Sequence, residues 1–159
     1  MCSSDLFTGP EDFEVSAVFP EIPALEFIGQ FGLYAGAGSD RAIRGGVIKL
    51  RKDGAEVYTQ FLVNNPDGKD TDLYEVGLLR PGTDLRLTLR RAAGRYTLTV
   101  EDLTAGGAST LAIRHPDYLD PERDLYVGLF AAEPRSDVGR KLVVSELRAT
   151  VWAATPAGR

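Results

Sequence analysis

The sequence predicts an all-β protein folded as a two-sheet antiparallel β-sandwich. Apolar and polar residues alternate with a period of two along almost every segment, turn-forming residues recur at short intervals, and no amphipathic helix of useful length is present. A parallel α/β sheet requires crossover helices between its strands. About ten strands with short connections therefore favour a sandwich.

The predicted strands follow one another with short connections. In chain order they cover residues 12–19, 27–36, 43–51, 55–63, 73–79, 84–91, 95–102, 109–114, 124–131 and 141–153. Residues 116–124 are proline- and aspartate-rich and predict a loop, with at most one helical turn. We expect residues 7–153 to form a single domain and residues 154–159 to form a flexible tail.

The first hairpin for which a register can be predicted turns at Asp53-Gly54. This dipeptide favours a two-residue type I′ connection. Such a turn places Ile48 opposite Thr59 on one face of the hairpin. The other face then carries four side chains, namely Val47, Lys49, Tyr58 and Gln60.

A second hairpin joins residues 85–90 to residues 96–101 through Ala93-Gly94. Keeping the apolar residues on one face requires Leu87 opposite Val100, because a slip of one residue would bury arginine. The same register places Arg86 opposite Glu101 on the outer face. An exposed pair of this kind contributes at most about 1 kcal/mol.

The last predicted strand places Val143, Leu147 and Val151 on one face. Trp152 falls on the other face with Val144. A single tryptophan at the end of a strand is more often structural than ligand-stacking, so we expect it to cover the edge of the sandwich.

Composition argues against several classes of partner and cofactor. The net charge of −5 opposes a general attraction to nucleic acid or anionic lipid. No apolar run approaches the ~20 residues of a membrane-spanning helix, so no membrane span is expected. Cys2 is the only cysteine and His115 the only histidine. An internal disulfide, a multi-cysteine zinc site and a multi-histidine metal site are therefore not expected within this chain.

Residues 1–6, which read Met-Cys-Ser-Ser-Asp-Leu, match the translation of a sequencing-adapter end. We expect these residues to be an assembly scar and the natural protein to extend upstream of Phe7. A native polar N-terminus is the alternative. Continuous genomic reads across the junction would exclude the adapter origin.

Three stretches together resemble a known superfamily: the hairpin 85–101, the run Asp-Leu-Tyr-Val-Gly-Leu-Phe-Ala at 124–131, and the closing strand 142–151. Their order is similar to that of the concanavalin A-like lectins and glucanases. More narrowly, it resembles uncharacterised bacterial jelly-roll domains of large, often exported, multidomain proteins. The resemblance implies a jelly roll with one concave sheet, a carbohydrate-related role and an extracytoplasmic location. A superfamily this broad does not determine function.

Glucanase-type catalysis is not expected. Glucanases of this superfamily carry alternating carboxylates on one strand, so that two of them flank the sugar bond. The nearest set here is Glu11, Asp12 and Glu14, of which the first two are adjacent and point to opposite faces. His115 has a suitable pKa for a general base, but it precedes Pro116 and has no nucleophile paired with it in sequence. A structural loop histidine is the preferred interpretation.

Residues 64–72 are rich in oxygen ligands and have the composition of a calcium loop, with Asp67, Asp70 and Asp72 as candidate ligands. Their spacing does not match an EF-hand. Asp-Gly after proline is turn chemistry in its own right, so a solvated turn is preferred and no cofactor is expected.

The best candidates for contact with a sugar are aromatic and planar polar side chains. Tyr58 and Gln60 are predicted to share a face with Lys49, and Tyr34 lies among glycines that would let a ligand approach the backbone. The preferred interpretation is that these tyrosines are buried between the two sheets. If the chain binds a ligand, Tyr34, Lys49, Tyr58 and Gln60 are the candidate ligand-binding residues.

The sequence as a whole predicts a non-catalytic module of a larger bacterial protein. It would bind an oligo- or polysaccharide or pack against neighbouring domains of its parent protein. Two alternatives stay open: a sugar-processing hydrolase of the same fold, and a purely structural packing module.

Overall fold

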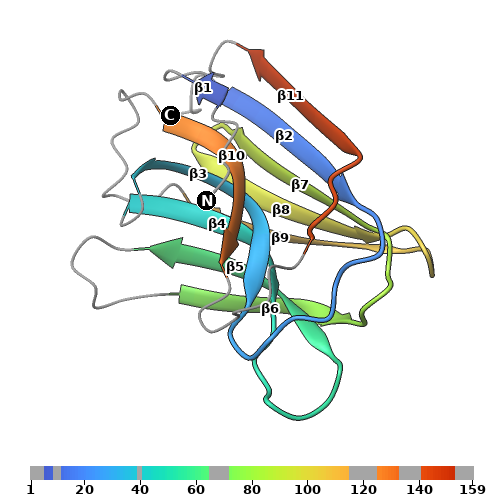
Figure 1. Cartoon of the computed structure of the whole chain (residues 1–159). Coiled ribbons are helices and arrows are strands. Elements are labelled where there is room, and N and C mark those ends of the chain that lie inside the picture. Colours follow the sequence, from blue (N-terminus) through green and yellow to red (C-terminus); the bar gives the residue numbers. More distant parts are fainter. Residues whose placement is uncertain are drawn as a thin grey trace.

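The structure is a computed structural model that describes residues 6–8, 12–38, 41–64, 72–114, 125–132 and 141–152. These residues form two antiparallel β-sheets that pack face to face (Figure 1). Sheet A has the strand order β1-β10-β3-β4-β5-β6, and sheet B has the order β11-β2-β7-β8-β9. The predicted all-β sandwich is confirmed. Within the described residues, no helix is long and apolar enough to span a membrane.

Four consecutive strands, β3 to β6, lie in sheet A, and three consecutive strands, β7 to β9, lie in sheet B. Sheet A contains β1 (Leu6–Thr8), β3 (Gln30–Gly38), β4 (Arg41–Ile48), β5 (Val57–Asn64), β6 (Asp72–Leu79) and β10 (Leu125–Ala132). Sheet B contains β2 (Asp12–Phe19), β7 (Leu85–Ala92), β8 (Arg95–Asp102), β9 (Ala108–Arg114) and β11 (Glu146–Trp152). Each predicted strand corresponds to one of these elements. The short strand β1 was not predicted, and it includes Leu6, so it overlaps the segment assigned to an adapter scar; that assignment stays a prediction.

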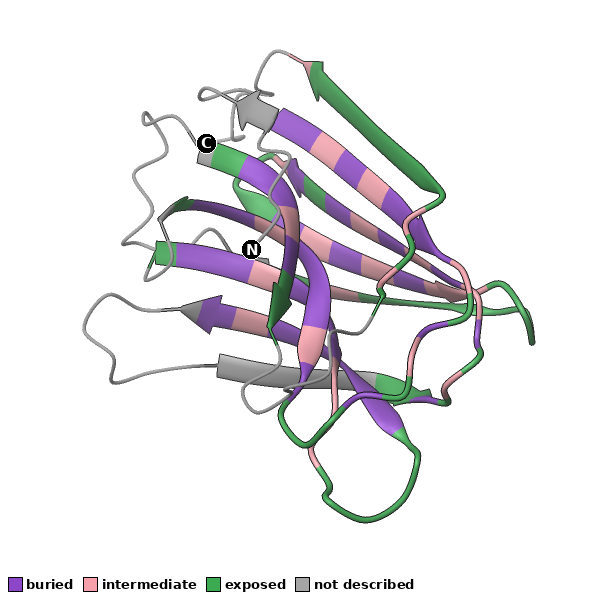
Figure 2. Cartoon of the chain, in the orientation of Figure 1, coloured by how far each residue is buried: buried purple, intermediate pink, exposed green. Residues whose placement is uncertain are grey.

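One apolar layer lies between the sheets, built from the alternate residues that the sequence pattern indicates. Figure 2 shows the alternation as bands of buried and less buried residues along β2, β7 and β8. Leu87 is 0% exposed and Val100 5% exposed. Their burial confirms the predicted inner face of the second hairpin.

The register of the second hairpin is also confirmed. Leu87 lies opposite Val100 and Arg86 opposite Glu101. Ala93 and Gly94 have φ values of 48° and 70°, as a two-residue type I′ turn requires. The Arg86–Glu101 ion pair is 3.5 Å long with both side chains about one-third exposed, so it contributes little.

The predicted register of the first hairpin is wrong. Ile48 lies opposite Tyr58 instead of Thr59. Val47, which was predicted to share a face with Tyr58, belongs to the core instead. Strand β4 ends at Ile48 and β5 begins at Val57, so a long loop replaces the two-residue turn.

A competing backbone interaction explains this difference. The Lys49 carbonyl accepts a hydrogen bond of 2.8 Å from the Ile28 N–H, and the Lys49 N–H donates one of 3.0 Å to the Gly29 carbonyl. Lys49 therefore pairs with the segment before β3. The chain reaches β5 only after the loop that follows Lys49. Gly54 has a positive φ of 90° but Asp53 does not, so the type I′ geometry is not formed.

Candidate functional site

The face of sheet A that points away from sheet B carries a set of aromatic and polar side chains. Their sequence neighbours Phe31, Leu33, Ile43, Val57 and Phe61 belong to the core, and successive residues of a strand point to opposite faces. We call this surface the outer face of sheet A. Its larger side chains are Gln30, Tyr34, Arg44, Ile48, Tyr58, Gln60, Leu62, Tyr126 and Phe130.

Strand pairing brings these residues together from distant parts of the chain. Gly128 lies opposite Tyr34, and Tyr34 lies opposite Arg44. Tyr126 lies opposite Gly36, which places it diagonally from Tyr34, at a spacing that aromatic side chains can bridge. One end of the outer face therefore combines two tyrosines with a guanidinium group.

Glycines form the floor beside this group. Phe130 lies opposite Gly32, Gly32 opposite Gly46, and Gly46 opposite Gln60. A Cβ at Gly32 would collide with the Gly45 backbone, and one at Gly46 with the Phe31 carbonyl oxygen. The close approach of β3 and β4 thus excludes side chains between Phe130 and Gln60.

Polar contacts connect the side chains across this floor. Gln60 donates a hydrogen bond of 2.9 Å from Nε2 to Oε1 of Gln30, and glycine at position 46 lets the two amides meet above β4. The Arg44 guanidinium lies 5.6 Å from the centre of the Phe130 ring, a favourable cation–π arrangement. Burial lowers the pKa of Arg44, although arginine keeps its charge at physiological pH.

Three of the four predicted binding residues, Tyr34, Tyr58 and Gln60, lie on this outer face. Tyr58 is only 9% exposed and Gln60 only 1%, so they do not form an exposed binding platform. The tyrosines lie on the outer face of sheet A and not between the two sheets, because their sequence neighbours occupy the core. Lys49 lies beyond the end of β4 and next to Ile48 in the β3–β4 ladder. Alternation sends neighbouring side chains to opposite faces, so Lys49 does not continue the outer face.

Tyr34 was identified from the sequence, but Arg44 and Tyr126, which are also accessible on the outer face, were missed. Tyr126 is 44% exposed, and Tyr34 and Arg44 are partly exposed. We call these three residues the open patch. The alternation of Tyr126, Gly128 and Phe130 was a usable signal, but nothing in the local sequence pairs β10 with β3.

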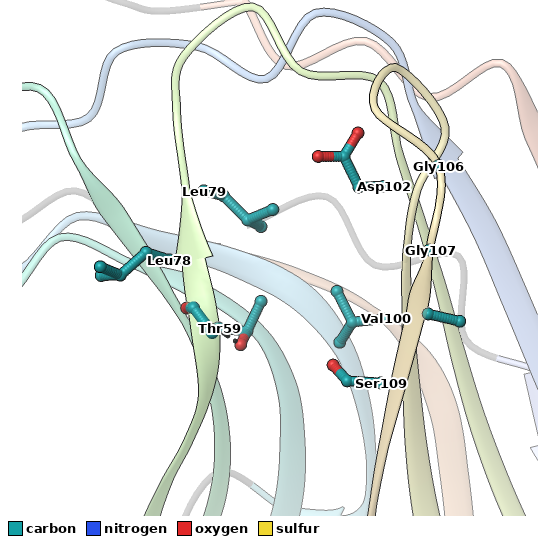
Figure 3. Close-up of a pocket in the computed structure, with 10 residues that line it drawn as sticks. Thr59, Leu78, Leu79, Val100, Asp102, Gly106, Gly107 and Ser109 are labelled. Carbon is teal, nitrogen blue, oxygen red and sulfur yellow. Dashed lines mark hydrogen bonds between the residues drawn. The ribbon is translucent and has the colours of Figure 1, made fainter.

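A cavity of about 220 Å³ lies at the opposite, open edge of the sandwich between β6 and β9 (Figure 3). The Thr59 hydroxyl donates to the Gly77 carbonyl at 3.3 Å on one side. On the other side, Oδ1 of Asp102 accepts bonds from the Thr104 and Ala105 N–H groups. The cavity is smaller than the ~300–1,000 Å³ of most small-molecule sites.

The two candidate catalytic residues that the structure describes, Asp12 and Glu14, lie on sheet B and do not join the open patch. Glu14 lies opposite Arg90 on sheet B, and Asp12 is 3% exposed. Glu11, Asp67, Asp70 and His115 lie outside the described residues, as does the side chain of Asp72. Within the part of the chain that the structure describes, no group of three or more His, Cys, Asp or Glu side chains is arranged to hold a metal ion.

Comparison with known proteins identifies the fold. No family model matches the sequence, and no curated protein sequence matches it. A functionally unknown protein from Saccharomyces cerevisiae has a similar structure, with a TM-score of 0.66 and 16% identity over 94% of this chain and 74% of that chain. The alginate lyase from Klebsiella pneumoniae gives a TM-score of 0.60 and 13% identity, over 89% of this chain and 60% of the lyase.

A phage protein module adds a third similar structure. The CBM2 module of an evolved Dit protein from Lactobacillus casei BL23 phage J-1 gives a TM-score of 0.59 and 8% identity, over 91% of this chain and 62% of that chain. At identities this low, the likeness shows a shared β-sandwich fold. Function has to be argued from the surface itself.

Proposed function

We propose that this chain is a non-catalytic carbohydrate-binding module and that its ligand rests on the outer face of sheet A. The observation that carries the proposal is the open patch, where Tyr34 lies between Arg44 on β4 and Tyr126 on β10, beside a floor of glycines. The concanavalin A-like relationship, an extracytoplasmic location and a larger bacterial parent protein belong to the same proposal.

The chemistry of the open patch suits a sugar ring. Tyrosine offers an apolar ring face together with a hydroxyl group, and the guanidinium group of Arg44 presents several donors in one plane. A sugar has an apolar C–H face and a rim of hydroxyl groups, so it can use both kinds of contact. The glycine floor lets such a ring approach the backbone.

Two of the similar structures agree with this proposal. One is named as an alginate lyase and the other as a CBM2 module. Both are β-sandwich proteins that share most of this chain's architecture. They support a glycan-related use of the fold, and the residues of the open patch supply the specific argument for this chain.

The proposal is tested by a glycan array followed by calorimetry on any glycan that binds. Tyr126→Ala should weaken binding by about tenfold or more, since a central aromatic contact is commonly worth over ~1 kcal/mol. Phe27→Ala is the matched control, because Phe27 is similarly exposed, at 38% against 44% for Tyr126, and lies outside the outer face. Failure of the wild-type chain to bind any glycan would count against the proposal.

A purely structural module is the second candidate, and the burial of Tyr58 and Gln60 favours it. Much of the outer face is then a packed surface instead of a binding surface. This candidate predicts that Tyr126→Ala and Phe27→Ala behave alike in the same experiments. The hydrolase alternative predicts release of new reducing ends from a bound glycan, which a reducing-sugar assay measures directly.

A further inference from the structure

Strand β11 forms the edge of sheet B and is exposed along almost its whole length. Figure 1 shows it at the outer side of β2, and Figure 2 shows it almost entirely in the colour of exposed residues. Leu147 is 38% exposed and Val151 45% exposed. Within the described residues, no other strand pairs with the outer side of β11.

Three of the devices that protect edge strands in other proteins are absent from residues 146–152: proline, a β-bulge and an inward-pointing charge. Residues 146–152 contain no proline, and their pairing with β2 runs without a register shift. The charges of Glu146 and Arg148 form an ion pair of 3.2 Å with each other, so the strand carries no net charge.

The free backbone groups of β11 are regularly spaced. The Leu103 N–H bonds to the Asp84 carbonyl in the β7–β8 register, so the odd-numbered residues of β7 bond to β2 and the even-numbered residues of β2 bond to β11. Backbone groups along a strand alternate in direction. Leu147, Ala149 and Val151 therefore direct their N–H and C=O groups outward, where another strand can bond to them.

We propose that β11 pairs antiparallel with β11 of a second copy of this chain, about a two-fold axis at Ala149. This register uses the full strand and places Leu147 opposite Val151 of the partner subunit. The exchange is reciprocal, as a two-fold interface requires. Two five-stranded sheets then join into one continuous sheet.

The strand sequence favours a second copy over an unrelated partner because it is self-complementary in this register. Apolar side chains meet apolar ones on the inner side, and Arg148 meets Thr150 of the partner subunit on the other side. Shifting the two-fold axis to Arg148 would place Arg148 opposite Arg148 of the partner subunit, which repels. A single strand pair is small for an interface, so the dimer is expected to be weak and concentration-dependent.

The proposal does not depend on carbohydrate binding. If both hold, the dimer carries two open patches, and a polymeric ligand that spans them gains avidity without any new contact. Monomeric variants would then keep their affinity for a short glycan and lose affinity for a long one.

The test is sedimentation velocity across a wide concentration range with two double variants. Leu147→Lys with Val151→Lys places like charges opposite each other at both symmetry-related positions and should weaken self-association by about tenfold or more. Leu147→Lys with Val151→Glu places each lysine opposite a glutamate and should restore the dimer. Leu78→Lys is the control, since Leu78 is 64% exposed on β6 at the other side of the sandwich.

Three results would overturn the proposal. The wild-type chain would stay monomeric at every concentration, or the double-lysine variant would dimerise as the wild type does, or the lysine–glutamate variant would fail to recover. Circular dichroism of each variant checks that the fold persists. All the substituted residues are exposed, so loss of the dimer with an unchanged spectrum reports on the interface.

Discussion

Three polar or charged side chains are buried together where β2, β7 and β8 meet at one end of sheet B. Asp12 is 3% exposed, Arg91 4% and Tyr96 0%. Arg91 lies opposite both Phe13 and Tyr96, and its guanidinium group is 5.9 Å from the centre of the Phe13 ring. Oδ2 of Asp12 accepts a hydrogen bond of 3.4 Å from the Ala93 N–H. The alternation that places Leu87 and Leu89 inward thus also buries Arg91 near the end of β7.

Burial raises the pKa of Tyr96 to about 12, although the charge of Arg91 opposes the shift. Tyrosine in an unfolded chain titrates near pH 10. The folded state therefore binds the Tyr96 proton more tightly than the unfolded state does. The resulting contribution to the free energy of unfolding is fully present below about pH 10 and is lost as the pH rises toward about 12. Denaturant unfolding should show that the free energy of unfolding declines between about pH 10 and about 12, and that this decline is smaller in Tyr96→Phe. An equal decline in both proteins would contradict this origin.

The hairpins show which features of an element can be predicted from local sequence. In β7–β8, the turn residues Ala93-Gly94 and the apolar alternation favour the same register, and the structure has it. At Asp53-Gly54 the turn signal competes with backbone bonds from Lys49 to Ile28 and Gly29. Those bonds join residues about twenty positions apart, so a local pattern does not contain them.

The pairing of β3 with β4 depends on a glycine at position 46. A Cβ there would meet the Phe31 carbonyl oxygen, which is backbone and cannot turn aside. Gly46→Ala should destabilise the fold by about 1–3 kcal/mol, the usual cost of overpacking. Gly77→Ala is the matched control, since a Cβ at Gly77 has nothing within 4 Å. Urea unfolding of both variants measures the difference, and equal losses would contradict the crowding argument.

At the scale of the whole molecule, the sandwich is stabilised by the apolar layer between the sheets. Leu87 is 0% exposed within this layer, whereas Leu147 is 38% exposed at the edge. Leu87→Ala should therefore cost about 2–5 kcal/mol of unfolding free energy, and Leu147→Ala should cost much less. The two variants are compared by thermal and urea unfolding at a concentration where the chain is monomeric. Similar losses of unfolding free energy in both would contradict the expectation that Leu147 stabilises the fold much less than Leu87.

The sequence by itself determined the fold class and, in the β7–β8 hairpin, which side chains face inward. A strand has a side-chain period of two, so Leu87 and Val100 are assigned to the core by counting along the chain. The tertiary structure decided which strands are neighbours. Tyr34, Arg44 and Tyr126 form the open patch only because β3 pairs with both β4 and β10, and the β3–β10 pairing joins segments almost a hundred residues apart. Contacts of that range depend on how the whole apolar layer closes, and no turn or local alternation encodes them.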